Sequence, residues 1–235
     1  MHKVILILLA STFFMATSAF SEEQASLKDK VERYSYAIGI SIGNKINQQG
    51  IDINTDLLMK GLKDGLSGGR GLLNDAEYVE VLTTLSKEVT AKQEEEMKKL
   101  GDKNKLDGQR FLDENKKKEG VKTLTSGLQY KVIKEGKGKI PKATDTVTVH
   151  YQGTLIDGNE FDSSIKRGEP ATFPVDGVIR GWTEALQLMK EGAKWQLFIP
   201  SDLAYGEKGA GNVIGPNETL IFDVELISIE KSENK

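Results

Sequence analysis

The stretch His150-Tyr151-Gln152-Gly153 begins the part of this chain that decides its fold. Short groups of aromatic and aliphatic residues follow it, each beside one or two polar residues. In order, the groups are Asp157-Gly158, Phe161-Asp162-Ser163-Ser164, Val178-Ile179-Arg180-Gly181-Trp182, Ile199-Pro200, Leu203-Ala204-Tyr205-Gly206 and Leu220-Ile221-Phe222-Asp223. This set predicts an apolar, aromatic-lined pocket that contains a few polar groups.

Hydrophobic residues in this region alternate with polar ones, which is the period of half-buried antiparallel strands. The alternating sets are Leu128, Tyr130 and Val132; Val147, Val149 and Tyr151; Trp195, Leu197 and Ile199; and Leu220, Phe222, Val224 and Leu226. Asp157-Gly158 is typical of a hairpin turn. A short helix is predicted from the buried face Trp182, Ala185, Leu186 and Met189, with Gly192 at its end. We therefore expect residues 119–235 to form an antiparallel sheet wrapped around one short helix.

Residues typical of covalent or metal catalysis are missing from this pattern. The chain has no cysteine, and no serine–histidine pair, metal cluster or phosphate loop has the required spacing. His150 stands beside Tyr151 on a predicted strand, and we expect it to be an ordinary exposed residue that faces the other way. The sequence therefore predicts neither a cofactor nor a metal site.

In their order and nearly gapless spacing, the quoted groups closely resemble the FKBP-type peptidyl-prolyl cis/trans isomerases. The whole chain is similar to the exported macrophage infectivity potentiator (Mip) and FkpA-like group, through Tyr36-Ala37-Ile38-Gly39, Gly50-Ile51-Asp52 and residues 216–222. The resemblance implies an α+β fold with an N-terminal all-helical dimerisation module, a long connecting helix and an FKBP-like C-terminal antiparallel sheet around a short helix. It also implies peptidyl-prolyl isomerase activity on proline-containing polypeptides.

The resemblance implies a role for each matching position of the pocket. The catalytic residues that it implies are Tyr151, Asp162, Trp182, Tyr205 and Phe222. The substrate-binding residues are Tyr151, Phe161, Asp162, Arg167, Val178, Ile179, Trp182, Tyr205, Val213, Ile214 and Phe222. Trp182 would form the floor, the Ile179 N–H and Tyr205 hydroxyl would hold substrate carbonyl groups, and Arg167 would orient Asp162 and Tyr205.

Three positions depart from the family pattern. Ala171 stands where many members carry an aromatic residue, Ala210 occupies a position that is often larger, and Gly215 replaces a frequent proline. These departures leave open the substrate preference and the affinity for macrolide inhibitors of the FK506 and rapamycin type.

Residues 1–21 have the layout of a secretory signal peptide. A basic start at Lys3 precedes an apolar run, and small residues predict cleavage after Ala19 or Ser21. A membrane anchor is the alternative, but polar residues interrupt the run before the roughly 20 apolar residues that a spanning helix needs. We expect an exported protein in the periplasm, the outer membrane or at the cell surface of a Gram-negative bacterium. It would not be a lipoprotein, because that anchor requires a cysteine.

Residues 22–73 are expected to form the helical dimerisation domain. A first helix is predicted from the helical spacing of Val31, Tyr34, Ile38, Ile42 and Ile46, with a capping box at Ser26-Leu27-Lys28-Asp29 and an end at Gly50. A second helix should start near Asn54 or Thr55, with Leu58, Leu62 and Leu66 on one stripe. Gly39 and Gly43 would allow close helix packing, either within one chain or across a homodimer interface formed by residues 26–70. The spacing alone leaves both interpretations open.

Residues 74–118 are expected to form the long connecting helix, capped by Asn74 with Glu77. Its apolar stripe nearly vanishes between Thr90 and Lys105, which predicts a solvent-exposed spacer. Gly101 and Gly108 are expected to be weak points that allow the helix to bend.

The net charge of −3 and the pI of about 5.6 provide no basic excess for binding a phosphate backbone, so we expect no nucleic-acid partner. The expected function is prolyl isomerisation that assists the folding of exported proteins. An additional role as a virulence-associated surface factor is part of the same expectation. The alternative is a holdase or assembly chaperone that binds unfolded clients between the arms of a dimer, with isomerisation secondary.

Overall fold

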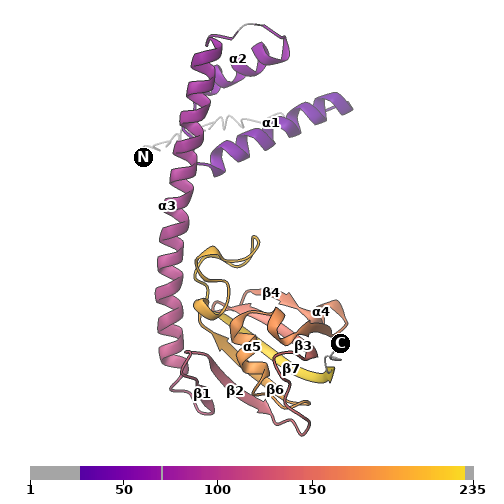
Figure 1. The fold of residues 1–235 in the computed structure, drawn as a ribbon. Coiled ribbons are helices and arrows are strands. Elements are labelled where there is room, and N and C mark those ends of the chain that lie inside the picture. The colour runs from indigo at the N-terminus through magenta and orange to yellow at the C-terminus, as the bar shows by residue number, and fades with distance from the viewer. Residues whose placement is uncertain (1–26, 70, 231–235) are drawn as a thin grey trace, which may run out of the picture. The chain divides into compact units, whose positions relative to one another are not determined.

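The computed structural model describes residues 27–69 and 71–230 of the chain (Figure 1). The predicted signal peptide, residues 1–21, lies outside these ranges. The chain divides into two compact units, one ending at Thr55 and the other beginning at Asp56, and each is described by itself. Within the described ranges, no helix combines the length and the apolar character needed to cross a membrane.

Helix α1, Lys30–Gln48, is the helix of the first unit. Asp29 caps it, since its carboxylate accepts hydrogen bonds of 2.7 and 2.9 Å from the N–H groups of Val31 and Glu32. The expected cap Ser26 lies outside the described residues, and the helix starts after Asp29. Gly50 has a φ of 59° and follows the last turn, which confirms the predicted end of the helix.

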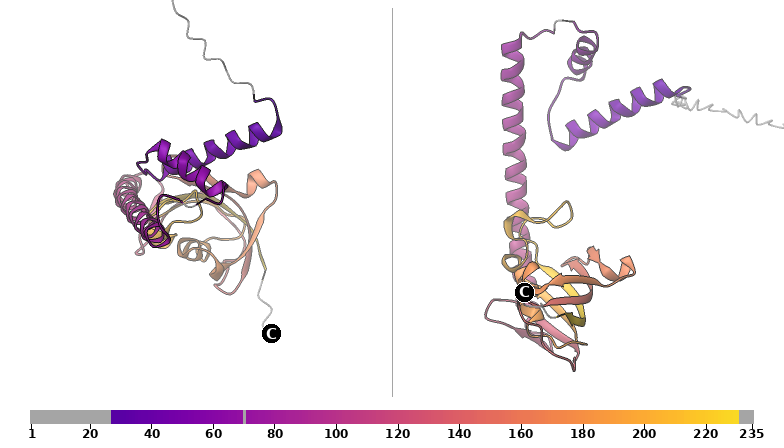
Figure 2. Two further views of the ribbon diagram at one scale, coloured as in Figure 1. Left: turned by 90° about the horizontal axis from the view of Figure 1, so that it is seen from above. Right: turned by 45° about the vertical axis from the view of Figure 1, so that its right-hand side comes forward.

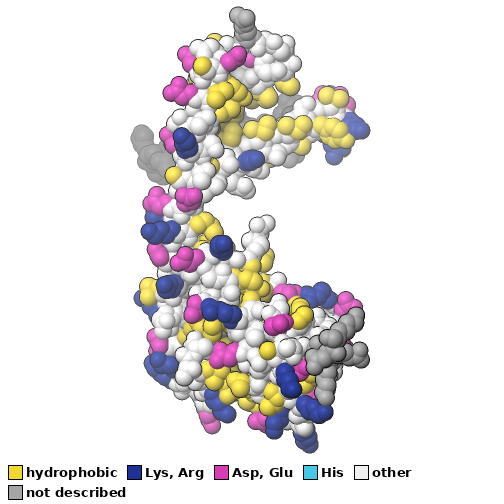
Figure 3. Space-filling view, in the orientation of Figure 1, with side chains coloured by type: hydrophobic (Ala, Val, Ile, Leu, Met, Phe, Trp, Pro, Cys, Tyr) yellow, Lys and Arg dark blue, Asp and Glu magenta, His cyan; other side chains and the backbone are white. Residues whose placement is uncertain are grey.

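The apolar stripe of α1 is exposed to solvent in the single chain. Its exposed members include Val31, Tyr34, Ile38 and Ile42. Figure 3 shows hydrophobic side chains in a row along this helix. Helix α1 is amphipathic in sequence, but none of its residues is buried. Among the described residues of the first unit, nothing covers its apolar stripe.

The second unit contains helix α2, Thr55–Leu66, apart from its first residue, and the long helix α3, Asp75–Asn115. The predicted capping box of α3 is confirmed, because Asn74 accepts from the Glu77 N–H at 3.0 Å and the Glu77 carboxylate accepts from the Asn74 N–H at 2.9 Å. The polar run from residue 90 to residue 100 is exposed, as expected of a solvated spacer.

The last turns of α3 are not a free spacer. One face is buried there, and its members are Gly101, Asn104, Gly108, Leu112 and Asn115. The predicted weak points Gly101 and Gly108 lie on this face: α3 runs through both as one element to Asn115, and both glycines are contact points.

The described part of the second unit contains a seven-stranded antiparallel sheet. Its strands are β1 Val121–Thr123, β2 Gln129–Lys134, β3 Thr146–Leu155, β4 Glu160–Ser163, β5 Ala171–Pro174, β6 Lys194–Ile199 and β7 Leu220–Glu230. The order across the sheet is β1-β2-β6-β7-β3-β4, and β5 also pairs with β3. The helices α4, Ser164–Arg167, and α5, Arg180–Leu186, lie in the connections between the strands.

The sheet curls around α5, and the core lies between them (Figures 1 and 2). Trp182, Ala185 and Leu186 on α5 are buried together with the inward residues of the strands, such as Val149 and Leu197. Burial alternates along β3, as the sequence period predicted. The predicted antiparallel sheet around a short helix is therefore confirmed.

Candidate functional site

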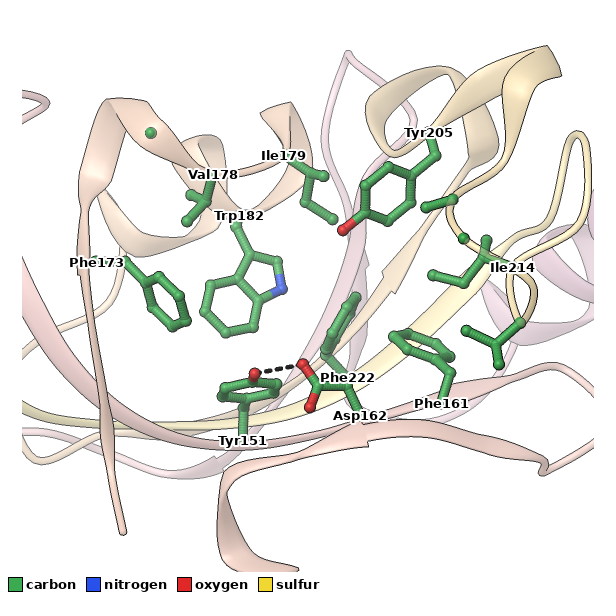
Figure 4. Close-up of a pocket in the computed structure, with 14 residues that line it drawn as sticks. Tyr151, Phe161, Asp162, Phe173, Val178, Ile179, Trp182, Tyr205, Ile214 and Phe222 are labelled. Atoms are coloured by element: carbon green, nitrogen blue, oxygen red, sulfur yellow. Dashed lines mark hydrogen bonds between the residues drawn. The ribbon is translucent and has the colours of Figure 1, made fainter. Parts of the chain in front are cut away.

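A cavity of about 630 Å³ opens between the sheet and the start of α5 (Figure 4). Its walls combine strand residues with residues from two loops. The lining residues are Tyr151, Phe161, Asp162, Phe173, Gly177, Val178, Ile179, Trp182, Tyr205, Ala210, Gly211, Val213, Ile214 and Phe222. Most of this surface is aromatic or aliphatic, so water gains few hydrogen bonds inside it.

Trp182 forms the centre of the aromatic cluster. Its side chain is only 4% exposed, and its ring stands edge-to-face to Tyr151, Phe222 and Phe173 at centroid distances of 5.3, 5.2 and 6.0 Å. Phe161 meets Phe222 in the same way at 5.5 Å. Such perpendicular pairs bring the positive edge of one ring to the negative face of another, typically adding about 0.5–1.5 kcal/mol per pair beyond burial.

The strand register brings these residues together. Gly153 on the central strand β3 pairs with Phe222 on β7 and with Asp162 on β4. A Cβ atom at Gly153 would lie 2.7 Å from both the Phe161 and the Phe222 rings. Only glycine at this position therefore permits the two rings to close over the strand.

The polar part of the cavity is a cluster of Tyr151, Asp162 and Arg167. The Tyr151 hydroxyl donates to Asp162 Oδ2 at 2.5 Å, and Arg167 donates to Asp162 Oδ1 and, at 2.8 Å, to the Tyr151 hydroxyl. The guanidinium also lies 5.5 Å from the centre of the Tyr151 ring. Ser163 caps α4 through its hydroxyl, which fixes the short turn that carries Arg167.

Burial and hydrogen bonds together determine which groups of this cluster carry a charge. Burial by itself favours the neutral form of Asp162, but the hydrogen bonds from Tyr151 and Arg167 outweigh it, so the pKa of Asp162 lies below its ordinary value. Burial, followed by the hydrogen bond to Asp162, raises the pKa of Tyr151. Tyr151 therefore remains a neutral donor to a charged carboxylate at neutral pH.

Ten of the eleven predicted substrate-binding residues line the cavity, and Arg167 lies behind Asp162 and Tyr151. The expectation that Arg167 orients Tyr205 is wrong, because its described hydrogen bonds go to Asp162 and Tyr151. Tyr205 lies across the cavity from Tyr151 and directs its hydroxyl inward (Figure 4). That hydroxyl has no hydrogen-bond partner within residues 27–69 and 71–230.

Phe173 is a wall residue that the sequence reasoning missed. It stands two positions after Ala171 on β5, so the strand period puts both on one face of the sheet. Ala171 packs against the core without lining the cavity, while the Phe173 ring reaches Tyr151 and Trp182. The alternation Ala171-Thr172-Phe173 was the signal that could have found it.

His150 is not the ordinary exposed residue that we expected. It is half-buried, and its Nδ1 lies 3.1 Å from the Ser164 hydroxyl, which also accepts from the Tyr151 N–H at 2.8 Å. His150 does not line the cavity. Over the described ranges, no group of three or more histidine, cysteine or acidic residues is placed to hold a metal ion.

Two family models match this chain over nearly all of the described residues. The model described as FKBP-type peptidyl-prolyl cis-trans isomerase matches residues 137–227, and the model of the domain amino terminal to that isomerase matches residues 31–132. The chain belongs to the FKBP-type peptidyl-prolyl cis/trans isomerase family. It is an FKBP-type isomerase with the amino-terminal domain found beside that catalytic domain.

Relatives of this FKBP-type isomerase match it over most of their length. The outer membrane protein MIP of Legionella longbeachae is 49% identical over 93% of this chain and 94% of its own, and the isomerase Mip of Coxiella burnetii is 43% identical over 98% and 100%. The crystal structure of FkpA from Escherichia coli superposes with a TM-score of 0.71 at 41% identity, covering 88% of this chain and 99% of that one. The resemblance to the Mip and FkpA-like group is thereby confirmed.

Proposed function

We propose that the aromatic cavity is the active site of this isomerase and acts on X–Pro bonds in exported proteins. The observation that carries the proposal is the combination of one charged carboxylate with a wall of edge-to-face aromatic rings around a cavity of about 630 Å³. A cavity of this size accommodates a proline ring and the residues on either side of it.

The chemistry of the reaction suits such a cavity. Rotation about an X–Pro bond is opposed by amide resonance, with a barrier of roughly 18–20 kcal/mol. No covalent bond breaks, so the site needs neither a nucleophile nor a proton shuttle. The twisted amide has lost its resonance and much of its dipole, so an apolar pocket penalises the planar ground state more than the twisted state.

In this proposal the proline ring lies over Trp182, and two donors hold the neighbouring carbonyl groups. They are the Ile179 N–H and the Tyr205 hydroxyl, and neither has a hydrogen-bond partner within the described chain. The free Ile179 N–H supports a role in binding substrate, since half-buried donors otherwise find partners. The Tyr205 side chain is 42% exposed, and its role is supported by the direction of its hydroxyl into the cavity. Asp162, held by Arg167, supplies the field that favours the twisted amide.

The test is a proline-limited refolding assay and a proline-peptide assay on the full-length chain. Uncatalysed isomerisation takes roughly 10–100 s, so acceleration is measured against that time. We expect Asp162→Leu and Tyr205→Phe to lower kcat/KM, and Tyr130→Phe, on the strand β2 outside the cavity, to leave it unchanged. Wild-type activity in both cavity variants would remove these residues from the mechanism.

We also propose a homodimer formed through residues 26–70. The exposed apolar stripes of α1 and α2, including Ile38, Ile42 and Leu62, support this, because isolated chains rarely leave such stripes uncovered. Sedimentation equilibrium should give a dimer mass for the wild type. Ile38→Glu and Ile42→Glu together should give a monomer, and Asn44→Glu, which lies away from the stripe on the same helix, should keep the dimer. An unchanged mass in the double variant would refute this interface.

Residues 1–21 act as signal peptide, 22–73 as dimerisation domain, 74–118 as connecting helix and 119–235 as isomerase domain, which would deliver the protein to the periplasm or the outer surface. The aromatic cavity would also bind macrolides of the FK506 and rapamycin type. Titration of the catalysed rate with rapamycin tests this, and a rate that is insensitive at saturating inhibitor would contradict it.

A further inference from the structure

One wall of the cavity is a loop, residues 204–219, which has no partner strand. It contributes Tyr205, Ala210, Gly211, Val213 and Ile214 to the lining. Internal hydrogen bonds give it a shape: Ala210 and Ile214 exchange backbone bonds of 2.9 and 3.1 Å, and the Asn217 N–H donates to the Gly206 carbonyl at 2.8 Å. These bonds tie the loop to itself, so its position in the cavity wall depends on what holds its base.

Helix α3 holds that base. The Asn104 side chain is 7% exposed and donates through Nδ2 to the Pro216 carbonyl at 3.0 Å. Asn217 donates back through its side-chain amide to the Gly101 carbonyl at 3.3 Å. Asn217 has a φ of 56°, a left-handed conformation that asparagine tolerates and that aims its amide at the helix.

Gly108 forms the closest approach between helix and loop. A Cβ atom at this position would lie 3.1 Å from Thr219 Cβ and still closer to Thr219 Oγ1. Thr219 is 3% exposed and directly precedes β7, so it has no free space to move into. Glycine is a poor helix former, and its presence inside α3 is explained by this contact.

The helix is itself fixed to the sheet beyond these contacts. The Leu112 carbonyl accepts from Gln129 at 2.9 Å, and the Asn115 amide donates to the Gln129 side chain at 3.0 Å. The Phe111 ring packs against Phe198 of β6 at 6.0 Å. The last turns of α3 are therefore a fixed support on β2 and β6, and the loop is attached to that support.

We infer that Gly101, Asn104 and Gly108 are positioning residues that set the loop wall of the active site against Trp182. Pro216 is two residues from Ile214, and Gly206 is one residue from Tyr205, so a displacement of the loop base moves both wall residues. The inference rests on the proposed function of the cavity. Helix α3 then has two roles: it connects the domains, and it positions a wall of the active site.

The test uses the full-length protein and three single variants. Asn104→Ala removes the bond to Pro216, and Gly108→Ala introduces the clash with Thr219. The matched control is Gly61→Ala, since a Cβ at this helical glycine of α2 would meet nothing within 4 Å. Two quantities are measured at a temperature at which circular dichroism shows every variant to be folded: kcat/KM on a proline tetrapeptide, and hydrogen exchange of segments 204–219, β3 and β7.

We expect kcat/KM to fall on the order of tenfold in Asn104→Ala and Gly108→Ala, because misplacement of a binding wall by a fraction of an ångström weakens transition-state contacts. Exchange in residues 204–219 should accelerate while β3 and β7 keep their protection. Gly61→Ala should change neither quantity. Thr219→Ala, added to Gly108→Ala, removes Oγ1 and should restore at least half of the lost kcat/KM.

Two folded variants with wild-type kcat/KM and wild-type exchange in residues 204–219 would overturn the inference. A second outcome would also overturn it: kcat/KM falls, Thr219→Ala does not restore it, and hydrogen exchange in residues 204–219 is unchanged. That combination would indicate a general structural defect and not a displaced loop. If the wild type itself does not catalyse, the proposed function fails, and the exchange of residues 204–219 alone decides whether α3 holds the loop.

Discussion

The hydroxyl group of Tyr151 donates a 2.5 Å hydrogen bond to the carboxylate of Asp162, across the junction of strands β3 and β4. Arg167 donates to both residues, so each member of this cluster is held by the other two. A charged group fixed in this way needs no reorganisation when the substrate amide twists.

We expect Tyr151→Phe to lower kcat/KM by about three- to tenfold. A hydrogen bond to a charged group contributes about 1.5–3 kcal/mol when buried, and partial exposure of Asp162 reduces this. The matched control is Tyr130→Phe, because Tyr130 stacks on Trp195 at 4.3 Å and lies outside the cavity. Peptide kinetics on both variants check the prediction, and equal activity in the two would contradict it.

Trp182→Ala should affect both stability and substrate binding. Removing a buried tryptophan typically costs about 3–5 kcal/mol, because the cavity that remains does not fully collapse. Trp195→Ala provides the control, since Trp195 is 6% exposed and also has a buried indole nitrogen without a partner, but is absent from the cavity.

Urea denaturation should show comparable losses in the two tryptophan variants. The KM for a proline peptide should rise only in Trp182→Ala, measured where both are folded. A similar rise of KM in Trp195→Ala would mean that the effect comes from general loosening of the core.

Gly153→Ala should destabilise the domain by about 1–3 kcal/mol, the usual cost of overpacking. The added methyl group would lie 2.7 Å from the Phe161 and Phe222 rings, which cannot both retain their positions. Thermal denaturation measures the loss, and kcat/KM should fall with it because both rings line the cavity. Gly61→Ala is the control at an open position, and equal melting temperatures for the two variants would contradict this explanation.

The lowered pKa of Asp162 predicts a pH dependence of stability at acidic pH. Its folded-state pKa lies below the unfolded value of roughly 3.9, so its contribution is complete above that value and is lost as pH falls through the folded pKa. Asp162→Asn removes this titration. Melting temperatures between pH 6 and pH 2 should therefore fall less steeply at the acid end in Asp162→Asn, and parallel curves would exclude Asp162 as a contributor.

Much of the site could be predicted from local sequence. The period-2 pattern around Tyr151 and Phe222 specifies which side chains of a strand point inward, and the helical spacing after Ile179 specifies the buried face of α5. These signals depend only on neighbouring residues, because strand and helix geometry fix the direction of each side chain. The capping box at Asn74 belongs to the same kind of signal.

The partners of Arg167 and Gly108 could not be predicted in this way. The resemblance implies that Arg167 orients Tyr205, but the turn of α4 directs it to Tyr151. The partner of a long, flexible side chain depends on several torsion angles, and local sequence does not specify these. The sequence marks Gly108 only as a weak point, because a helical glycine usually weakens a helix. Its actual role depends on Thr219, far along the chain.

The sequence by itself determined the alternating strands of the isomerase domain and its short helix, because backbone periodicity and turn residues encode them locally. The family resemblance, and not the periodicity, supplied ten of the residues that line the pocket. Only the tertiary structure decided that α3 supports the loop wall, through contacts such as Asn104 with Pro216, 112 residues apart. Such pairings depend on how whole elements pack, because the free energy gained by burying a helix face depends on the residues of both packed surfaces. No single segment carries that information.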